Sequence, residues 1–192
     1  RLPAIALRGL VVFPGNIIHF EVGRKKSIAA IEWAMSNNNA VFLTAQQDMD
    51  VEDPGFKDLY AYGVVAEVKQ VLRVSDELVK VLVEGKYRAK LLTLDSSGRF
   101  LLASTKAAAL RGTKSVDSAR MEALVRSVKE VFEEYLSLNP RLSKDVVYTI
   151  ITNEDAALLC DYIPANLLLK YTDKQALLNE GTVSGRLEKL LE

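Results

Sequence analysis

The chain has 192 residues, enough for one large domain or two small ones that bury a core. Its 25 basic and 25 acidic residues balance to a formal charge of zero, so the total charge gives no electrostatic footprint for nucleic acid or an anionic membrane. One cysteine, Cys160, excludes an internal disulfide and fits a reducing, cytoplasmic compartment. No apolar run approaches the roughly 20 residues of a membrane-spanning helix, and we expect no membrane contact.

The chain from residue 2 to about 107 has mainly the period-two pattern of β-strands. An early stretch, "VVFPGNIIHFEVGRKKS" at 11–27, breaks at Phe13-Pro14-Gly15, resumes as an apolar run and ends in Gly23 and three basic residues. Helical spacing follows in 25–39, where three asparagines end the helix. "VFLTAQ" then returns to strand, and residues 47–58 form an acidic loop with a Pro-Gly pair.

Three further strands follow as an antiparallel meander, with turns at 75–77 and 95–98. The first of them, "YGVVAEVKQVLRV", places mostly apolar residues on one face: Val64, Ala66, Val68, Leu72 and Val74. Charged residues occupy the other face, which is typical of a half-buried strand.

Beyond residue 115 the period becomes helical. A helix of about 20 residues ends at Asn139-Pro140, and shorter helices are predicted at 144–152 and at 154–163, the latter ended by Pro164. Thr172 and Gln175 form a predicted capping box, with Gly181 as the stop, and a last helix begins near Val183. We therefore predict an α+β chain with a β-rich domain at 1–112, a helical domain at 113–192 and a boundary at "LRGTKSVDS", residues 110–118.

The sequence shows no motif that is typical of a catalytic, cofactor-binding or metal-binding site. The one imidazole, His19, lies in a strand-like run, where a packed or edge-exposed histidine is expected. Cys160 lies among apolar helix residues and fits a buried structural thiol. The acidic residues at 48–53 lack EF-hand spacing, and residues 15–27 lack the glycine pattern of a phosphate loop. We expect no catalytic, cofactor-binding or metal residue in this chain.

Three basic residues, Arg24, Lys25 and Lys26, stand at the start of the first predicted helix. The helix macrodipole is positive there, so each cation costs a few tenths of a kcal/mol. One interpretation is a solvated turn, and the other is a contact for an acidic partner or a neighbouring subunit that offsets this cost.

The motifs taken together resemble a known family. "LPAIALRGLVVFPGNIIHFEVGRKKSIAAIEWAM", the meander "GVVAEVKQVLRVSDELVKVLVEGKYRAKLL" and "DYIPANLLLKYTDKQALLNEGTVSGRLEKLLE" are similar, in this order, to the N-terminal domain of Lon, the ATP-dependent AAA+ serine protease. The departures are local, at Ala156-Ala157-Leu158 and Pro164. The resemblance implies a PUA-like pseudobarrel followed by a helical bundle, and it makes Phe13-Pro14-Gly15 a turn between paired strands and Gly23 a joint between strand and helix.

What the resemblance implies for function is a part without catalysis. Lon uses a Ser-Lys dyad and an ATPase with a Walker A loop, and neither motif occurs here, so ATP and Mg²⁺ are expected to belong to a missing domain. The chain begins without Met and stops inside a helical pattern, so we expect a piece of a longer, cytoplasmic protein that works in protein quality control as a homohexamer.

Two roles remain open at this point. The chain is either a module that binds unfolded, damaged or degron-bearing polypeptide or a structural spacer that steadies the ring. RNA binding by a PUA-like fold would rest on fold analogy alone, and nucleic acid is not expected. The candidate substrate contacts are apolar residues that fall on both faces of the early strands and at a corner: Phe13, Pro14, Ile17, Ile18 and Phe20. Core packing is the competing role for each of them.

Overall fold

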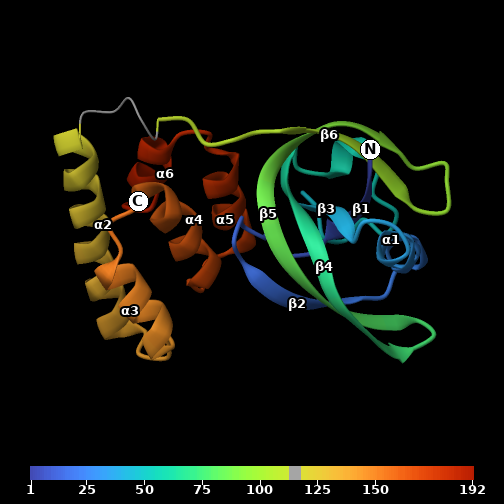
Figure 1. The fold of residues 1–192 in the computed structure, drawn as a ribbon, viewed down its shortest axis with the longest axis horizontal. Coiled ribbons are helices and arrows are strands. Elements are labelled where there is room, and N and C mark those ends of the chain that lie inside the picture. Colours follow the sequence, from blue (N-terminus) through green and yellow to red (C-terminus); the bar gives the residue numbers. More distant parts are fainter. Residues whose placement is uncertain (113–117) are drawn as a thin grey trace. The chain divides into compact units, whose positions relative to one another are not determined.

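The computed structural model describes residues 1–112 and 118–192, which divide into two compact units. The first unit contains residues 1–109 and 170–179, and the second contains residues 110–169 and 180–192. The predicted α+β class is confirmed, with strands in the first unit and helices in both (Figure 1). The predicted boundary segment at 110–118 includes residues 113–117, which lie outside the described residues.

The first unit is built on a six-stranded sheet. Its elements are β1 Leu2–Leu7, β2 Ile17–Val22, α1 Lys25–Met35, β3 Ala40–Ala45, the 3₁₀ turn η1 Phe56–Asp58, β4 Tyr62–Ser75, β5 Leu78–Asp95, β6 Leu101–Ala107 and α5 Tyr171–Asn179. The strand order is β2-β5-β4-β3-β1-β6, and β6 also pairs with β5. Strands β1, β3, β4, β5 and β6 therefore form a closed ring of pairings, in which β1 and β3 are parallel.

Strand β2 stands outside that ring. It pairs with the first half of β5, from Ile17 opposite Glu84 to Val22 opposite Val79, and within the described residues it pairs with no other strand. The turn before it runs from Phe13 to Asn16, where the Asn16 amide donates to the Phe13 carbonyl at 3.1 Å. Pro14 fixes its first central position and Gly15, at φ +78°, its second, as a type II turn requires. The predicted turn is confirmed, but β1 and β2, the strands on either side of it, are not paired with each other.

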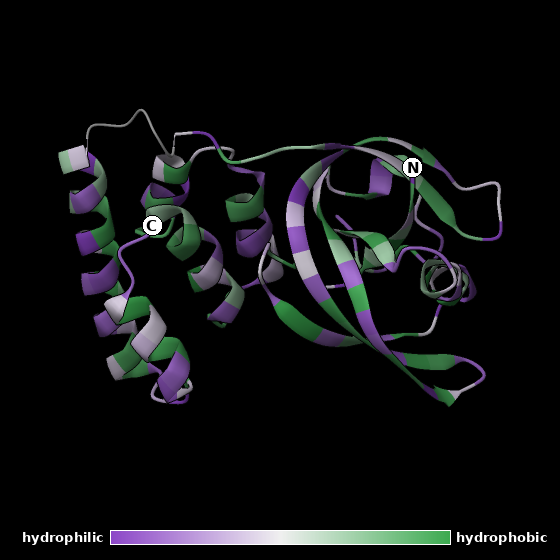
Figure 2. Ribbon diagram, viewed as in Figure 1, coloured by the Kyte–Doolittle hydropathy of each residue, from purple (hydrophilic) through white to green (hydrophobic). Residues whose placement is uncertain are grey.

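Two register shifts in β4 overturn the predicted alternation of its far half. Val68 lies opposite Val83 and Gln70 opposite Leu82, so Lys69 is an extra residue that moves Leu72 to the other face of the strand. A second shift between Arg73 and Ser75 leaves Val74 without an opposite residue. Figure 2 shows the hydrophobic colouring continuing to the far end of the β4–β5 hairpin.

Helix α5 belongs to the first unit, although the sequence reading placed it in the helical half at 113–192. The Gln175 side chain is buried and its Nε2 donates to the Tyr62 carbonyl of β4 at 2.9 Å. The predicted capping box at Thr172 does not form, because Gln175 is used for this anchor and the helix begins at Tyr171. Helix α5 ends at Asn179, two residues before the predicted stop at Gly181.

A buried arginine holds the end of α5. The Arg88 guanidinium of β5 donates to the carbonyls of Leu178 and Asn179 at 2.6 and 2.7 Å, and to that of Ala108 at 3.0 Å. It also lies 3.9 Å from the centre of the Tyr62 ring. Arg88 thus satisfies carbonyls that the end of a helix leaves without partners.

The described residues of the second unit form four helices around one apolar cluster. The helices are α2 Ser118–Leu138, α3 Lys144–Thr152, α4 Ala156–Asn166 and α6 Val183–Lys189. Phe132, Ile150, Leu159 and Leu187 are among the buried members of the cluster. The predicted stop at Pro164 is wrong: α4 continues to Asn166, because a proline near the end removes a single N–H and Leu167 still donates to the Ile163 carbonyl.

A buried ion pair joins α6 to α4 in the second unit. The Arg186 side chain is fully buried, and it contacts the Asp161 carboxylate and donates to the Glu180 carbonyl. Removing one partner of such a pair leaves an uncompensated buried charge, so the pair fixes how the two helices meet. No helix among the described residues has the length and apolar character needed to cross a membrane.

Candidate substrate-binding surface

The five apolar residues predicted to contact substrate have different fates. Phe13 is completely buried, so it belongs to the core. Ile17 is 64% exposed on β2, whereas Pro14, Ile18 and Phe20 are half-buried. The alternation along β2 explains the difference, since Ile18 and Phe20 share a face with the buried Val83 and Val81 of β5.

The backbone at Phe13 is fixed by close contact with β5. The Gly15 amide donates to the Gly85 carbonyl at 2.8 Å, and the Gly85 amide donates to the Asn16 carbonyl at 2.9 Å. A Cβ at position 85 would lie 2.3 Å from the Phe13 carbonyl oxygen, so this approach needs glycine. The turn therefore docks β2 onto the sheet and does not present Phe13 to a ligand.

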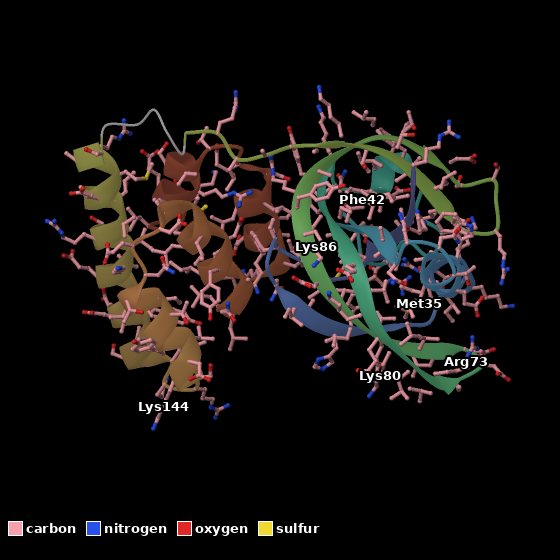
Figure 3. All side chains as sticks on the ribbon, in the orientation of Figure 1. Met35, Phe42, Arg73, Lys80, Lys86 and Lys144 are labelled. Atoms are coloured by element: carbon pink, nitrogen blue, oxygen red, sulfur yellow. The ribbon has the colours of Figure 1, made fainter. Side chains whose placement is uncertain are left out.

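A larger set of exposed apolar side chains lies at the far end of the β4–β5 hairpin and on α1. Leu72 and Val74 of β4 are 60% and 52% exposed, and Trp33 and Met35 of α1 are 39% and 44% exposed. We call these four residues, which lie on two neighbouring segments, the hairpin–helix surface; Leu72 lies opposite Lys80, on the other face of β4 from Arg73. Figure 3 labels Met35 and Arg73 in this region.

An ion pair holds the two segments of the hairpin–helix surface side by side. The Arg73 guanidinium, between Leu72 and Val74, lies 2.7 Å from the Glu32 carboxylate, which precedes Trp33. Arg99 binds the other oxygen of Glu32 at 2.9 Å, and the Trp33 ring lies 5.7 Å from that of Phe100. Arg73 thus joins α1 to the hairpin, and Arg99 and Phe100 join α1 to the segment that precedes β6.

Sequence reasoning missed Leu72 and Val74 as surface residues. Strict alternation along the strand assigned both residues to the apolar face. The alternating pattern gives no sign of the extra residues in β4 that change which face a side chain occupies. A signal was available in "KQVLRVSDE", where six polar or charged residues surround three apolar ones next to a turn. This high share of polar residues indicates that the end of the hairpin extends beyond the hydrophobic core of the unit.

The sheet surface beside Ile17 carries an ion cluster. Lys69 and Lys86 each contact Glu67 and Glu84 at 2.7 to 3.0 Å. Hydrogen bonds from Lys86 and then Lys69 lower the pKa of both carboxyl groups. The two lysines are exposed and the two glutamates half-buried at the surface, so water screens these ion pairs and they contribute little to stability.

The three basic residues at the start of α1 differ in the contacts that they make. Arg24 donates to the carbonyls of Ala6 and Val51 at 3.3 and 3.2 Å, and Lys26 pairs with Asp53 at 3.0 Å. Lys25 is exposed. Gly23 lies between β2 and α1, as the predicted joint requires.

The single cysteine and the single histidine lie in different units. Cys160 is fully buried, and burial raises the pKa of its thiol to about 12, which keeps it protonated and inert. His19 is exposed on β2, in the other unit. Among the described residues no group of three or more His, Cys, Asp or Glu side chains could hold a metal ion.

The second unit has exposed apolar side chains of its own. Leu138 and Leu168 are 76% and 83% exposed, and they border a groove of about 590 Å³ that Tyr135 and Leu142 also line. Each unit therefore offers apolar surface suited to weak binding of apolar side chains.

The architecture matches that of solved N-terminal domains of an ATP-dependent protease. The N-terminal domain of the Mycobacterium avium complex Lon protease superposes with a TM-score of 0.78 at 20% identity, covering 99% of this chain and 95% of that one. The Lon N-terminal domain protein from Xanthomonas campestris gives a TM-score of 0.67 at 17% identity, covering 99% of this chain and 96% of that one.

Sequence comparison identifies the family. The family model described as the ATP-dependent protease La (LON) substrate-binding domain matches residues 1–192. The Lon proteases of Desulforamulus reducens and of Escherichia coli K12 are each 38% identical, over 98% and 100% of this chain and 23% and 24% of their own lengths. The chain belongs to the LON substrate-binding domain family, and it spans about a quarter of the length of these relatives.

Proposed function

We propose that this chain binds unfolded, damaged or degron-bearing polypeptide and delivers it to the hexameric ATP-dependent protease of which it forms a part. The observation that carries the proposal is the hairpin–helix surface, where four large apolar side chains are 39–60% exposed on segments held together by Glu32 and Arg73. Unfolding exposes apolar side chains in any protein, so a surface of this kind recognises the unfolded state rather than one sequence.

Each copy of the surface is small, and a disordered ligand loses entropy when it binds. We therefore expect a dissociation constant of about 10–100 μM for one copy. Six copies on a ring would raise the overall affinity through avidity, so weak single sites are sufficient. ATP and Mg²⁺ would act in the ATPase domain of the whole protein and not in this chain.

The earlier candidate residues fit this proposal in part. Ile17 joins the exposed apolar residues of the first unit, and Lys25 is the basic residue best placed to contact an acidic partner or another subunit. Arg24 and Lys26 bind groups within the chain, which gives them a structural role. We also infer a PUA-like pseudobarrel for the first unit, on the support of its closed ring of five strands.

Substitutions in the hairpin–helix surface test where unfolded protein binds. The double variant Leu72→Ser/Val74→Ser is expected to weaken binding of a labelled, permanently unfolded protein about fivefold or more, measured by fluorescence anisotropy. Leu92→Ser is the matched control, because Leu92 is a 48% exposed leucine on the other half of β5. Equal weakening by the control would show that exposed leucines act without a defined site. A loss confined to Leu138→Ser/Leu168→Ser would move the site to the second unit.

A further inference from the structure

Strand β2 has one free edge in the sheet of the first unit. It pairs with β5 on one side (Figure 1), and it packs extensively against no other described helix or strand. The free edge of a strand carries a row of backbone N–H and C=O groups that another extended chain can pair with. The hydrogen bonds around Gly85 show which groups of β2 these are.

The direction of the β2 backbone groups can be followed from Gly85 of β5. Its carbonyl accepts from the Gly15 amide at 2.8 Å and its amide donates to the Asn16 carbonyl at 2.9 Å, so both groups of Gly85 point to the β2 side. Successive residues of a strand direct their backbone groups to alternate sides, so every second residue of β5 from Gly85 to Val79 faces β2. The β2 residues that lie opposite these positions, in a register without shifts, are Ile18, Phe20 and Val22.

The alternate residues Ile17, His19 and Glu21 therefore direct their N–H and C=O groups to the free edge. No hydrogen bond joins these groups to another segment in the parts of the chain that the structure describes. All three residues are exposed, and Ile17 is 64% exposed. The edge thus presents three donors and three acceptors to solvent at the spacing of a β-strand.

A cavity of about 300 Å³ adjoins the second half of β2. Phe20 and Val22 line it from β2, and Ile5, Leu7 and Leu10 line it from β1 and the residues that follow β1. Its other walls include charged side chains. This volume is at the lower end of ligand-binding pockets, so it has room for about one or two side chains and not for a folded element. A chain that lies along β2 could place an apolar side chain here.

We propose that the free edge of β2 binds an extended segment of substrate polypeptide as an added β-strand. The backbone of the segment pairs with Ile17, His19 and Glu21, and these bonds do not depend on its sequence. Alternate side chains of the segment lie beside the half-buried Ile18 and Phe20, which favours apolar residues at those positions.

An unfolded chain is the occupant that this edge fits. A folded protein has already paired most of its own backbone groups, so it has few to offer to a strand edge. An unfolded chain has these groups free in any sequence, together with apolar side chains for the cavity. The inference rests on the proposed function, because it gives the way in which this unit holds an unfolded segment.

Two variants at one position test the edge in the 192-residue chain. His19→Pro removes an N–H that points to the free edge and takes no part in the pairing with β5, so the strand should tolerate it. We expect this variant to weaken binding of a dye-labelled, permanently unfolded protein about three- to tenfold, because one backbone hydrogen bond is lost. His19→Ala is the matched control, since it removes the side chain and keeps the N–H, and its affinity should stay within about twofold of the parent. Urea unfolding midpoints close to that of the parent would show that both variants are folded.

Methylated peptides test the same edge from the side of the ligand. The probe is a dye-labelled octapeptide that alternates leucine and serine, with a lysine at each end for solubility. One derivative is N-methylated at every leucine and the other at every serine, so each loses the donors of one edge and keeps every side chain. We expect one derivative to bind about tenfold more weakly than the unmethylated probe and the other to bind within about twofold of it. Slower hydrogen exchange at the His19 and Glu21 amides with bound probe would support the pairing directly.

The outcomes separate this inference from the proposed function. Equal effects of the two methylated peptides, or equal affinities of His19→Pro and the parent, would overturn the added strand. If Leu72→Ser/Val74→Ser still weakened binding of the unfolded protein in that case, the proposed function would stand without it. A parent chain that dimerises, with a monomeric His19→Pro variant of unchanged peptide affinity, would show that the edge joins two copies and would also overturn the inference.

Discussion

Two buried polar residues hold helix α5 against the strands of the first unit. Arg88 donates to three carbonyls and stacks on Tyr62, and Gln175 anchors α5 on β4. Neither role follows from periodicity, because both side chains act across more than 80 residues of sequence. Lysine in place of Arg88 would lack the planar fork that reaches three acceptors.

Replacing Arg88 with methionine is expected to lower the free energy of unfolding by about 2–4 kcal/mol, because buried helix-end carbonyls lose their donors. The measurement is urea unfolding followed by circular dichroism. Lys106→Met, at an exposed lysine of β6, is the control and should lie within about 0.5 kcal/mol of the parent. Equal effects of the two variants would contradict the structural role of Arg88.

The thiol of Cys160 reports on the second unit. With its pKa raised to about 12 by burial, roughly one thiol in ten thousand would be ionised at pH 8. We expect almost no reaction with a thiol reagent at pH 8 in the native chain and rapid reaction in denaturant. Fast labelling without denaturant would show that α4 is not packed as described.

At the scale of elements, the extra residues in β4 determine which side chains face solvent. The sequence predicted the existence and type of most strands and helices, because those depend on periodicity and on turn residues such as Pro14, Gly15 and Pro140. It could not predict the bulge at Lys69, since a single inserted residue leaves no change in composition. Among the candidate substrate contacts, Ile17 is exposed and Phe13 is core, and Leu72, which was assigned inward, is exposed; contact with substrate stays a prediction for Ile17.

A pair of variants in one hairpin tests this assignment of faces. Leu72→Ser is expected to change the free energy of unfolding by no more than about 0.5 kcal/mol, because Leu72 is 60% exposed. Val79→Ser, a residue 2% exposed opposite Arg73, is expected to cost about 2–3 kcal/mol through a lost apolar group and a buried hydroxyl. A large cost for Leu72→Ser would place this residue in the core and remove the bulge argument.

At the scale of the whole molecule, two units with exposed apolar surface fit a domain that meets many unrelated polypeptides. The closed ring of strands includes β4, which carries Leu72 and Val74, and the ion pair of Arg73 with Glu32 joins this strand to α1. Under the proposed function the substrates share no sequence, so recognition would depend on exposed apolar side chains such as those of the hairpin–helix surface.

The central claim is that the chain distinguishes unfolded from native polypeptide, and a titration tests it most directly. The chain is titrated into one dye-labelled protein, held unfolded by reduction and alkylation of its disulfides, and into the native form of that protein. Saturable binding of the unfolded form with a dissociation constant of about 10–100 μM, and none of the native form over the same range, is the predicted result. Equal binding of both forms, or of neither at high micromolar concentration, would contradict substrate recognition and leave the chain as a structural spacer.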